Sequence, residues 1–300
     1  IRDRLLSLPI ASANGTWTDL LTAAFTSTTS VCVTGLVVVD TFSYWSLFGK
    51  GVILILIQIG GLGIVSIITL FMLLLRMKIT LKSTMLLQDA FNLNSKQGLL
   101  KFTIKVIKGT FLIEGIGALI YSFYYCREYG FLKGIWFSVF HAVSAFCNAG
   151  IDIMGADSLI SYHSNLLMML NTSFLIIMGG IGFIVWWDTV EAFRRIRTKR
   201  CSIRSAWNGV HLQTKIAIFM TLLLLIGGTI VIYFLERSNP DTLGNLSEKD
   251  RILNAFFQSV TFRTAGFAAV SQVALRPVTA FFGVLLMTVS YTHLTLPTKL

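Results

Sequence analysis

The chain has 300 residues, of which 54% are hydrophobic and 13% are charged. Charged residues usually make up about a quarter of a soluble domain, so this composition excludes an ordinary soluble protein and predicts an integral membrane protein. The net charge of +11 does not indicate nucleic-acid binding, because the Lys and Arg residues lie in loops between apolar segments, with no base-stacking aromatic residues among them.

Four apolar runs are long enough to cross a hydrocarbon core about 30 Å thick. In chain order, these expected spans are Leu47–Leu75, Phe102–Tyr125, Leu166–Trp187 and Leu212–Leu235. Three shorter segments, better suited to re-entrant half-helices, are Trp17–Thr29, Phe131–Ala145 and Glu248–Val260. Ser247 with Asp250 predicts a capping box at the start of the third half-helix, and Thr16 or Thr18 is expected to cap the first.

Each half-helix leads to a glycine, and the three glycines are almost evenly spaced. Gly150 follows Gly35 by 115 residues, and Gly266 follows Gly150 by 116 residues. Each glycine comes after a short polar stretch and before a new hydrophobic segment. The pattern predicts a repeated unit of helix, half-helix, irregular loop and helix within a membrane. A ring of such loops is how a protein builds an ion filter.

The chemistry of a cation filter explains why glycine recurs in these loops. Backbone carbonyl oxygens replace the hydration shell of the ion, and glycine permits backbone conformations that other residues avoid. The half-helices end just before the loops, so the partial negative charge at their C-termini favours a cation. The small or hydroxylated neighbours that let the loops approach closely are Thr34, Ala149, Thr264 and Ala265. Alternatively, the glycines only allow close helix packing in lipid, although three matched copies favour the filter.

The distribution of charge predicts the orientation in the membrane. The segments Arg76–Lys101 and Phe193–Gln213 are rich in Lys and Arg, and Asp89 is their only acid. By the positive-inside rule these segments are expected to be cytoplasmic, while the more acidic segments beside the half-helices face outward. The basic run RRIRTKR is interpreted as a topology anchor, which is compatible with a docking surface for a cytosolic partner.

The filter segments resemble those of a known family. SVCVTGLVVVDT, SAFCNAGID and TFRTAGF closely resemble the filter segments of the Ktr/Trk/HKT superfamily of potassium transporters, specifically the KtrB/TrkH-type membrane subunit of bacteria. The resemblance runs from about Trp17 to Thr288. It implies an all-α integral membrane fold in which repeated units of helix, re-entrant pore helix, filter loop and helix surround a pseudo-fourfold pore.

The resemblance also implies function and partners. It implies potassium uptake with sodium-sensitive behaviour, with potassium and sodium as transported or activating ions and no cofactor in this chain. It further implies a multi-pass protein of the bacterial inner membrane that forms homodimers and meets a cytosolic nucleotide-binding regulatory subunit of the KtrA/TrkA type. No nucleophile–base or carboxylate pair stands in a catalytic context, so an enzyme is not expected.

Carried over residue by residue, the resemblance places the ion path in three loops. The expected path comprises Cys32, Val33, Thr34 and Gly35, then Cys147, Asn148, Ala149 and Gly150, then Thr264, Ala265 and Gly266. Arg263 would repel a cation if it faced the pore, so it is expected to point behind the filter and hydrogen-bond the loop backbone. Asp40 and Asp152 are expected either to line the outer vestibule and concentrate cations or to be ordinary solvated loop acids.

Two glycine motifs, GGLGI at Gly60–Ile64 and GGIGF at Gly179–Phe183, are interpreted as points where a helix is weakened or packs closely on a neighbour. A nucleotide-binding role is excluded by the lack of a βαβ context. Glu114 lies inside an expected span, and it is either a functional acid or a partner in a buried hydrogen bond. It is the only support for a secondary cation symporter with a midplane site. A non-conducting scaffold subunit, the other alternative, would not need three matched glycines.

The pattern divides the chain into repeats and linkers. Residues 1–75 form a first repeat that lacks its first span, 76–101 a cytoplasmic linker, 102–192 a second repeat, 193–211 a basic cytoplasmic linker, and 212–290 a third repeat whose second span is truncated. Residues 291–300 resemble read-through of a sequencing adaptor and are left out of the fold prediction. A fourth repeat, expected about 115 residues beyond Gly266, is absent. The cysteines expected to be free thiols are Cys32, Cys126, Cys147 and Cys201.

Overall fold

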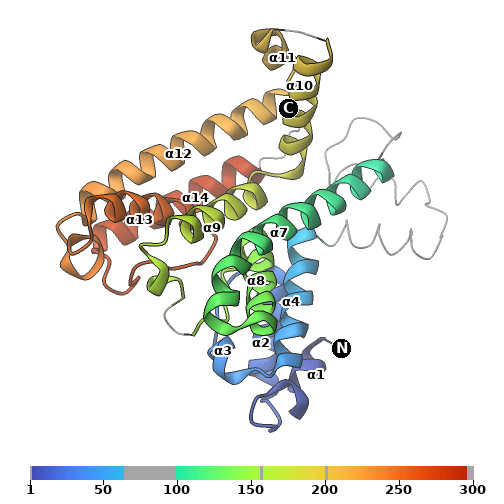
Figure 1. Ribbon diagram of the computed structural model, residues 1–300, viewed down its shortest axis with the longest axis vertical. Helices are drawn as coiled ribbons and strands as arrows, with labels where there is room; N and C mark the ends of the chain where they lie inside the picture. The colour runs from blue at the N-terminus through green and yellow to red at the C-terminus, as the bar shows by residue number, and fades with distance from the viewer. Residues whose placement is uncertain (1, 64–98, 156–157, 200–201, 296–300) are drawn as a thin grey trace.

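The computed structural model describes residues 2–63, 99–155, 158–199 and 202–295 (Figure 1). Over these residues the fold is helical, and the only extended pairing is an isolated antiparallel bridge between Ser12 and Trp45. Most of the expected cytoplasmic linker 76–101 lies outside the described residues, as does Cys201. Cys32, Cys126 and Cys147 are free thiols, as expected.

The helices of the described residues range from a single turn to a long span. They are α1 (Arg2–Ser7), α2 (Leu20–Cys32), α3 (Thr41–Tyr44), α4 (Leu47–Leu62), α7 (Leu99–Tyr129), α8 (Phe131–Phe146), α9 (Leu166–Gly180), α10 (Phe183–Lys199), α11 (Ile203–Asn208), α12 (Leu212–Glu236), α13 (Glu248–Thr261) and α14 (Pro277–Thr295). Short connecting turns are η1 (Pro9–Ala11), η2 (Ile160–Tyr162) and η3 (Pro240–Gly244), the last a single π-helical turn. Helix α14 extends into the segment 291–300 that was set apart as a tail.

The expected spans are confirmed in two cases and corrected in a third. Helices α7 and α12 are each long and apolar enough to cross a membrane. The expected span Leu166–Trp187 is wrong as a single helix, because α9 and α10 meet at an angle of 100°. The reason lies in Gly182, whose φ of 94° cannot continue a right-handed helix. Helix α4 ends at Leu62, and the remainder of that expected span lies outside the described residues.

The three half-helices correspond to α2, α8 and α13. Helix α2 corrects the expectation at both ends, since it begins at Leu20 and continues to Cys32. Its cap is Asp19, which accepts a hydrogen bond from the backbone N of Leu21 at 3.2 Å, in place of Thr16 or Thr18. An aspartate at this position satisfies a free backbone N–H and also places negative charge at the positive end of the helix dipole.

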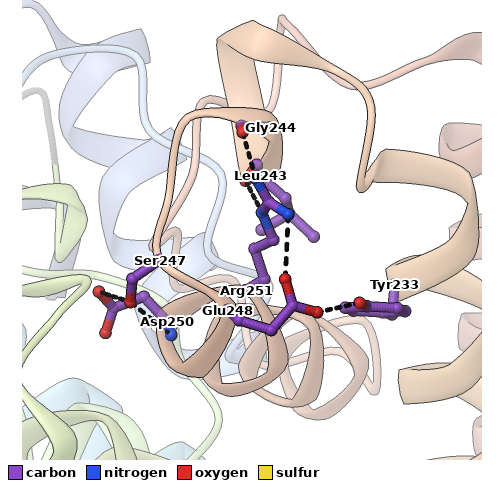
Figure 2. A network of polar contacts seen from close by, with 7 residues as sticks. All are labelled: Tyr233, Leu243, Gly244, Ser247, Glu248, Asp250 and Arg251. Atoms are coloured by element: carbon purple, nitrogen blue, oxygen red, sulfur yellow. Dashed lines mark hydrogen bonds and ion pairs between the residues drawn. The ribbon is translucent and has the colours of Figure 1, made fainter.

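The start of α13 confirms the expected capping box. Ser247 Oγ accepts a hydrogen bond from the backbone N of Asp250 at 3.3 Å and donates to the carboxylate of Asp250 at 2.8 Å. In the usual capping box, the acidic side chain accepts a hydrogen bond from the backbone N–H of the cap residue. Here the Asp250 carboxylate accepts from the Ser247 hydroxyl instead (Figure 2). This fixes the point at which the third half-helix begins.

A second set of contacts holds α13 to its neighbours. Glu248 accepts hydrogen bonds from the Tyr233 hydroxyl of α12 and, at 3.0 Å, from Arg251 Nη1 (Figure 2). Arg251 also donates to the carbonyl oxygens of Leu243 at 3.1 Å and Gly244 at 2.6 Å. The half-helix, the turn η3 and the end of α12 are thereby tied together at one end of the molecule.

At the same end, a fully buried carboxylate joins α12 to α14. Glu236 is 0% exposed and accepts hydrogen bonds from Asn239 Nδ2 at 2.7 Å and Thr242 Oγ1 at 2.6 Å. Its other oxygen accepts from the backbone N of Arg276 at 2.9 Å and from Thr279 Oγ1 at 2.5 Å. A buried carboxylate is tolerated only when it is hydrogen-bonded. Here the donors belong to the turn after α12 and to the start of α14, so the hydrogen bonds hold both segments to the end of α12.

The helices pack as three neighbouring groups. By their contacts, the groups are α1, α2 and α4, then α7, α8 and α9, then α12, α13 and α14. In Figure 1, α7 and α8 lie beside α2 and α4 in the lower half of the view, and α9 lies beside α12, α13 and α14 in the upper half. Contacts of α4 with α8 and of α13 with α9 join the groups. The main core surrounds α8, where Phe140, Phe146, Phe257 and Phe267 are all buried. Each group therefore contains one of the half-helices α2, α8 and α13, and the loops that follow the half-helices are brought together.

Candidate functional site

The three repeated glycines lie side by side. A methyl group on Gly35 would lie 2.6 Å from the carbonyl oxygen of Ala149, and one on Gly150 would lie 2.7 Å from the Cα of Gly266. The approach is mutual, because a methyl group on Gly266 would lie 2.9 Å from the Cα of Gly150. The second loop thus sits between the other two, backbone against backbone, at distances that exclude any side chain.

The loops share an unusual backbone conformation. Gly35, Gly150 and Gly266 have φ angles of 73°, 63° and 81°. Two residues before each glycine stands a residue that is also left-handed, and these are Val33 (54°), Asn148 (55°) and Thr264 (70°). A left-handed β-branched residue is costly, by about 1–3 kcal/mol, and persists only where its surroundings impose it. The same pair of left-handed positions in three loops indicates one loop structure built three times.

A hydroxyl group holds each loop in place. In every case a buried Ser or Thr from the end of the half-helix is hydrogen-bonded to the backbone of the residue that follows the glycine. The pairs are Thr29 Oγ1 with Leu36 N (3.1 Å), Ser144 Oγ with Ile151 O (2.5 Å) and Thr261 Oγ1 with Phe267 O (2.7 Å). These three residues are not among the predicted site residues, although the polar stretch before each glycine is a signal for them.

The remaining residues of the expected path differ in their exposure. Those with exposed or half-buried positions are Cys32, Val33, Thr34, Gly35, Asn148, Gly150, Thr264 and Gly266. Cys147, Ala149 and Ala265 are buried. Cys32 is the last residue of α2 and so belongs to the half-helix. The structure therefore brings together the backbones of the three loops, with several of the side chains turned into the protein.

Arg263 points away from the glycine junction. Its side chain is 7% exposed, and Nη2 donates a hydrogen bond to Thr221 Oγ1 of α12 at 3.3 Å. The guanidinium is therefore directed toward the long helix behind the third loop. With its guanidinium directed there, Arg263 does not place its positive charge beside the backbone of Gly266.

The two acids expected at the outer vestibule have local hydrogen-bond partners. Asp40 caps α3 by accepting from the backbone N of Phe42 at 3.3 Å and of Ser43 at 3.0 Å, and the Ser43 hydroxyl donates to it at 2.6 Å. Partial burial opposes ionisation, but the bonds from Ser43 and Phe42 and the charge of Lys50 outweigh it, so the pKa of Asp40 lies below its ordinary value. Asp152 accepts from the backbone N of Met154 at 3.2 Å.

The first glycine of each GGxG motif packs against the end of a half-helix. A methyl group on Gly60 would lie 2.2 Å from the carbonyl oxygen of Val31, and one on Gly179 would lie 1.7 Å from that of Phe146. Val31 and Phe146 each stand four residues before a loop glycine. The interpretation of these glycines as close packing points is confirmed, and the contact is the same in both copies.

The last glycine of each motif ends a helix. Gly63 (φ 78°) follows α4 and Gly182 (φ 94°) follows α9. The second loop is tied to this point, because the Asn148 amide in its satisfied orientation donates to the carbonyl of Ile176 and accepts from the backbone N of Gly180, both at 3.3 Å. The second motif thus joins the second loop to the break between α9 and α10.

Comparison with known proteins places the chain in a family. A family model described as TrkH, cation transport protein, matches residues 3–295. The chain belongs to the TrkH family. This TrkH-family chain is an all-helical membrane protein, and the descriptions of the family and its relatives are those of transporters, not enzymes.

Several curated relatives share much of this TrkH-family sequence. The chain is 41% identical over 271 residues to the potassium/sodium uptake protein NtpJ of Enterococcus hirae, covering 90% of this chain and 57% of that protein. It is 39% identical to the Ktr system potassium uptake protein B of Bacillus subtilis (94% and 60% covered) and 34% identical to that of Vibrio alginolyticus (89% and 56%). It therefore spans somewhat more than half the length of these relatives.

Proposed function

We propose that the protein carries potassium across a bacterial cell membrane through a pore whose selectivity filter is built from the loops at Gly35, Gly150 and Gly266. The observation that carries this proposal is the backbone contact of the three loops at Gly150. A dehydrated cation needs several oxygens around it, and adjacent glycine backbones supply carbonyl oxygens without a full negative charge that would trap the ion.

The half-helices supply a further attraction for a cation. Helices α2, α8 and α13 each end a few residues before a loop glycine, so their C-terminal partial negative charges lie beside the junction. The guanidinium of Arg263 is directed to Thr221 of α12, behind the third loop. Uptake of potassium agrees with the names of the relatives in Enterococcus and Bacillus, and sodium as a second transported or activating ion agrees with the name of the Enterococcus protein.

The wider assembly follows from the same repeat. Residues 1–75, 102–192 and 212–290 are proposed to be units of helix, pore helix, loop and helix around a pseudo-fourfold axis, joined by cytoplasmic linkers at 76–101 and 193–211. Asp40 and Asp152 lie in the outer vestibule in this arrangement. The protein would form a homodimer in the inner membrane and bind a cytosolic nucleotide-binding subunit, a partnership that agrees with the term "Ktr system" in the names of the relatives.

Rubidium uptake tests the proposal. The whole protein that carries this chain is expressed in a bacterial strain that lacks potassium uptake, and rubidium entry is measured with potassium or sodium as competitor. A filter predicts competition by potassium at much lower concentrations than by sodium. Absence of uptake would favour a scaffold subunit. Equal competition by the two ions, or a strict requirement for a second ion gradient, would favour a symporter.

A further inference from the structure

A polar pair crosses between two apolar helices beside the second loop. Glu114 of α7 is 4% exposed, and its Oε1 accepts a hydrogen bond from Gln58 Nε2 of α4 at 3.0 Å. The other oxygen, Oε2, is buried and has no hydrogen-bond partner among the residues that the structure describes. Buried polar groups inside a membrane are costly, and this pair carries that cost at the contact between two apolar helices, which makes it a candidate for a role beyond stability.

The pair lies next to the contact between the first and second repeats. Gly61 follows Gln58 by one turn of α4, and a methyl group on Gly61 would lie 2.2 Å from the Sγ of Cys147. Cys147 precedes Gly150 by three residues. Helix α4 therefore bonds to Glu114 through Gln58 and packs against Cys147, at the start of the second loop, through Gly61.

The geometry points to Gln58 and Glu114 as a positioning pair for the filter, a role that rests on the function proposed above. The hydrogen bond fixes the rotation of α4 about its axis, and that rotation sets how Gly61 presses on Cys147. Without the bond, α4 can turn by a few degrees, and the backbone between Cys147 and Gly150 moves with it. We propose that the pair thereby sets the preference for potassium over sodium without contacting the ion.

Leucine variants of the whole protein test this role. The readout is the ratio of the sodium and potassium concentrations that halve rubidium uptake, measured together with the amount of protein in the membrane. Glu114→Leu and Gln58→Leu are each expected to lower the ratio by about two- to tenfold, the factor that corresponds to one hydrogen bond of ordinary net strength. Glu114→Gln keeps an acceptor of the same size and is expected to retain the ratio.

The double variant separates positioning from simple stabilisation. Replacing both partners by leucine removes the unpaired polar group, so the amount of protein is expected to recover, because loss of both partners is nearly neutral for stability. The lowered ratio is expected to persist. Asn171→Leu is the matched control, because Asn171 of α9 is also buried, donates to the Gly117 carbonyl of α7 at 3.1 Å, and has a side-chain oxygen without a hydrogen-bond partner among the described residues. It is expected to lower the amount of protein but not the ratio.

Two outcomes would overturn the inference and leave the filter intact. One is an unchanged ratio in both single variants when Gly150→Ser lowers it, and the other is a ratio that recovers together with protein amount in the double variant. If Gly150→Ser also leaves the ratio unchanged, the filter itself is refuted, and the role of the pair with it.

Discussion

Gly150 and Gly266 approach so closely that a methyl group on either would lie within 3 Å of the other's Cα, at 2.7 Å and 2.9 Å. Gly35 makes its contact one residue away, at the carbonyl of Ala149. Gly150 is therefore the shared neighbour of both other loops. This order makes the three glycines unequal, a difference that their spacing in the sequence does not reveal.

The first prediction is that Gly150→Ser will reduce the preference for potassium more than Gly35→Ser. Both glycines have a left-handed backbone that a side chain would strain, but one at Gly150 would also collide with three backbone atoms of the third loop, whereas one at Gly35 would come within 3 Å of a single carbonyl oxygen. Rubidium uptake with competing sodium and potassium measures the change. Gly130→Ser is the control, because Gly130 has a φ of 79° but no atom within 4 Å of an added methyl group. Equal loss in the control would assign the effect to strain alone.

The second prediction concerns the hydroxyls behind the loops. Thr261→Val keeps the shape of the side chain but removes its hydrogen bond to the Phe267 carbonyl, and it is expected to cost about 1 kcal/mol of stability. Because the bond holds the residue after Gly266, potassium preference should fall as well. Thermal unfolding in detergent and competition uptake measure the two effects. Thr229→Val, which removes a bond within α12 to the Leu225 carbonyl, should leave preference unchanged.

The sequence predicted the repeat because the glycines are its visible mark. Their spacing gave the half-helices α8 and α13 within about one residue and indicated the meeting of the three loops. The break between α9 and α10 was only partly predicted. Hydropathy measures how apolar a segment is, so it gave Leu166–Trp187 as one span, and the GGIGF motif left open whether the helix is weakened there or packs closely on a neighbour.

Contacts between distant segments were missed for a related reason. Glu236 bonds to Arg276 and Thr279, which lie some forty positions further along the chain, and the sequence gives no sign that these groups meet. The hydrogen-bond partner of Glu114 could not be predicted for the same reason, since Gln58 lies 56 positions earlier in the chain. The prediction of Thr16 or Thr18 as the cap of α2 was wrong, because Asp19, directly before the helix, caps it.

The third prediction tests the GGxG packing. Gly179→Ala is expected to remove most folded protein from the membrane, because its methyl group would lie 1.7 Å from the Phe146 carbonyl, a backbone atom that cannot move aside. Gly227→Ala on α12 is the control, since nothing lies within 4 Å of its added methyl group and alanine favours the helix. Membrane protein amount and unfolding temperature are compared. Similar behaviour of the two variants would contradict the packing described here.

The fourth prediction separates the charge of Asp40 from its capping role. Asn is as good a helix cap as Asp, so Asp40→Asn should keep α3 intact. The lowered pKa of Asp40 means that it is ionised throughout the neutral range, and only acidification through that pKa removes its charge. If it concentrates cations at the vestibule, Asp40→Asn weakens apparent potassium affinity at low ionic strength and much less at high ionic strength. An affinity loss that does not depend on salt would refute the electrostatic role.

The fifth prediction concerns orientation. Helix α12 has 25 residues, so it is ~37 Å long and its two ends lie on opposite sides of a hydrocarbon core of ~30 Å. Its first end adjoins the basic α10 and α11, and its last end adjoins η3. In a background without native cysteines, Asp241→Cys should therefore react with an impermeant thiol reagent added to intact cells. Arg197→Cys should react only after the membrane is opened, because the basic segment is expected in the cytoplasm. Labelling of Arg197→Cys from outside would reverse the topology and place the filter loops on the cytoplasmic side.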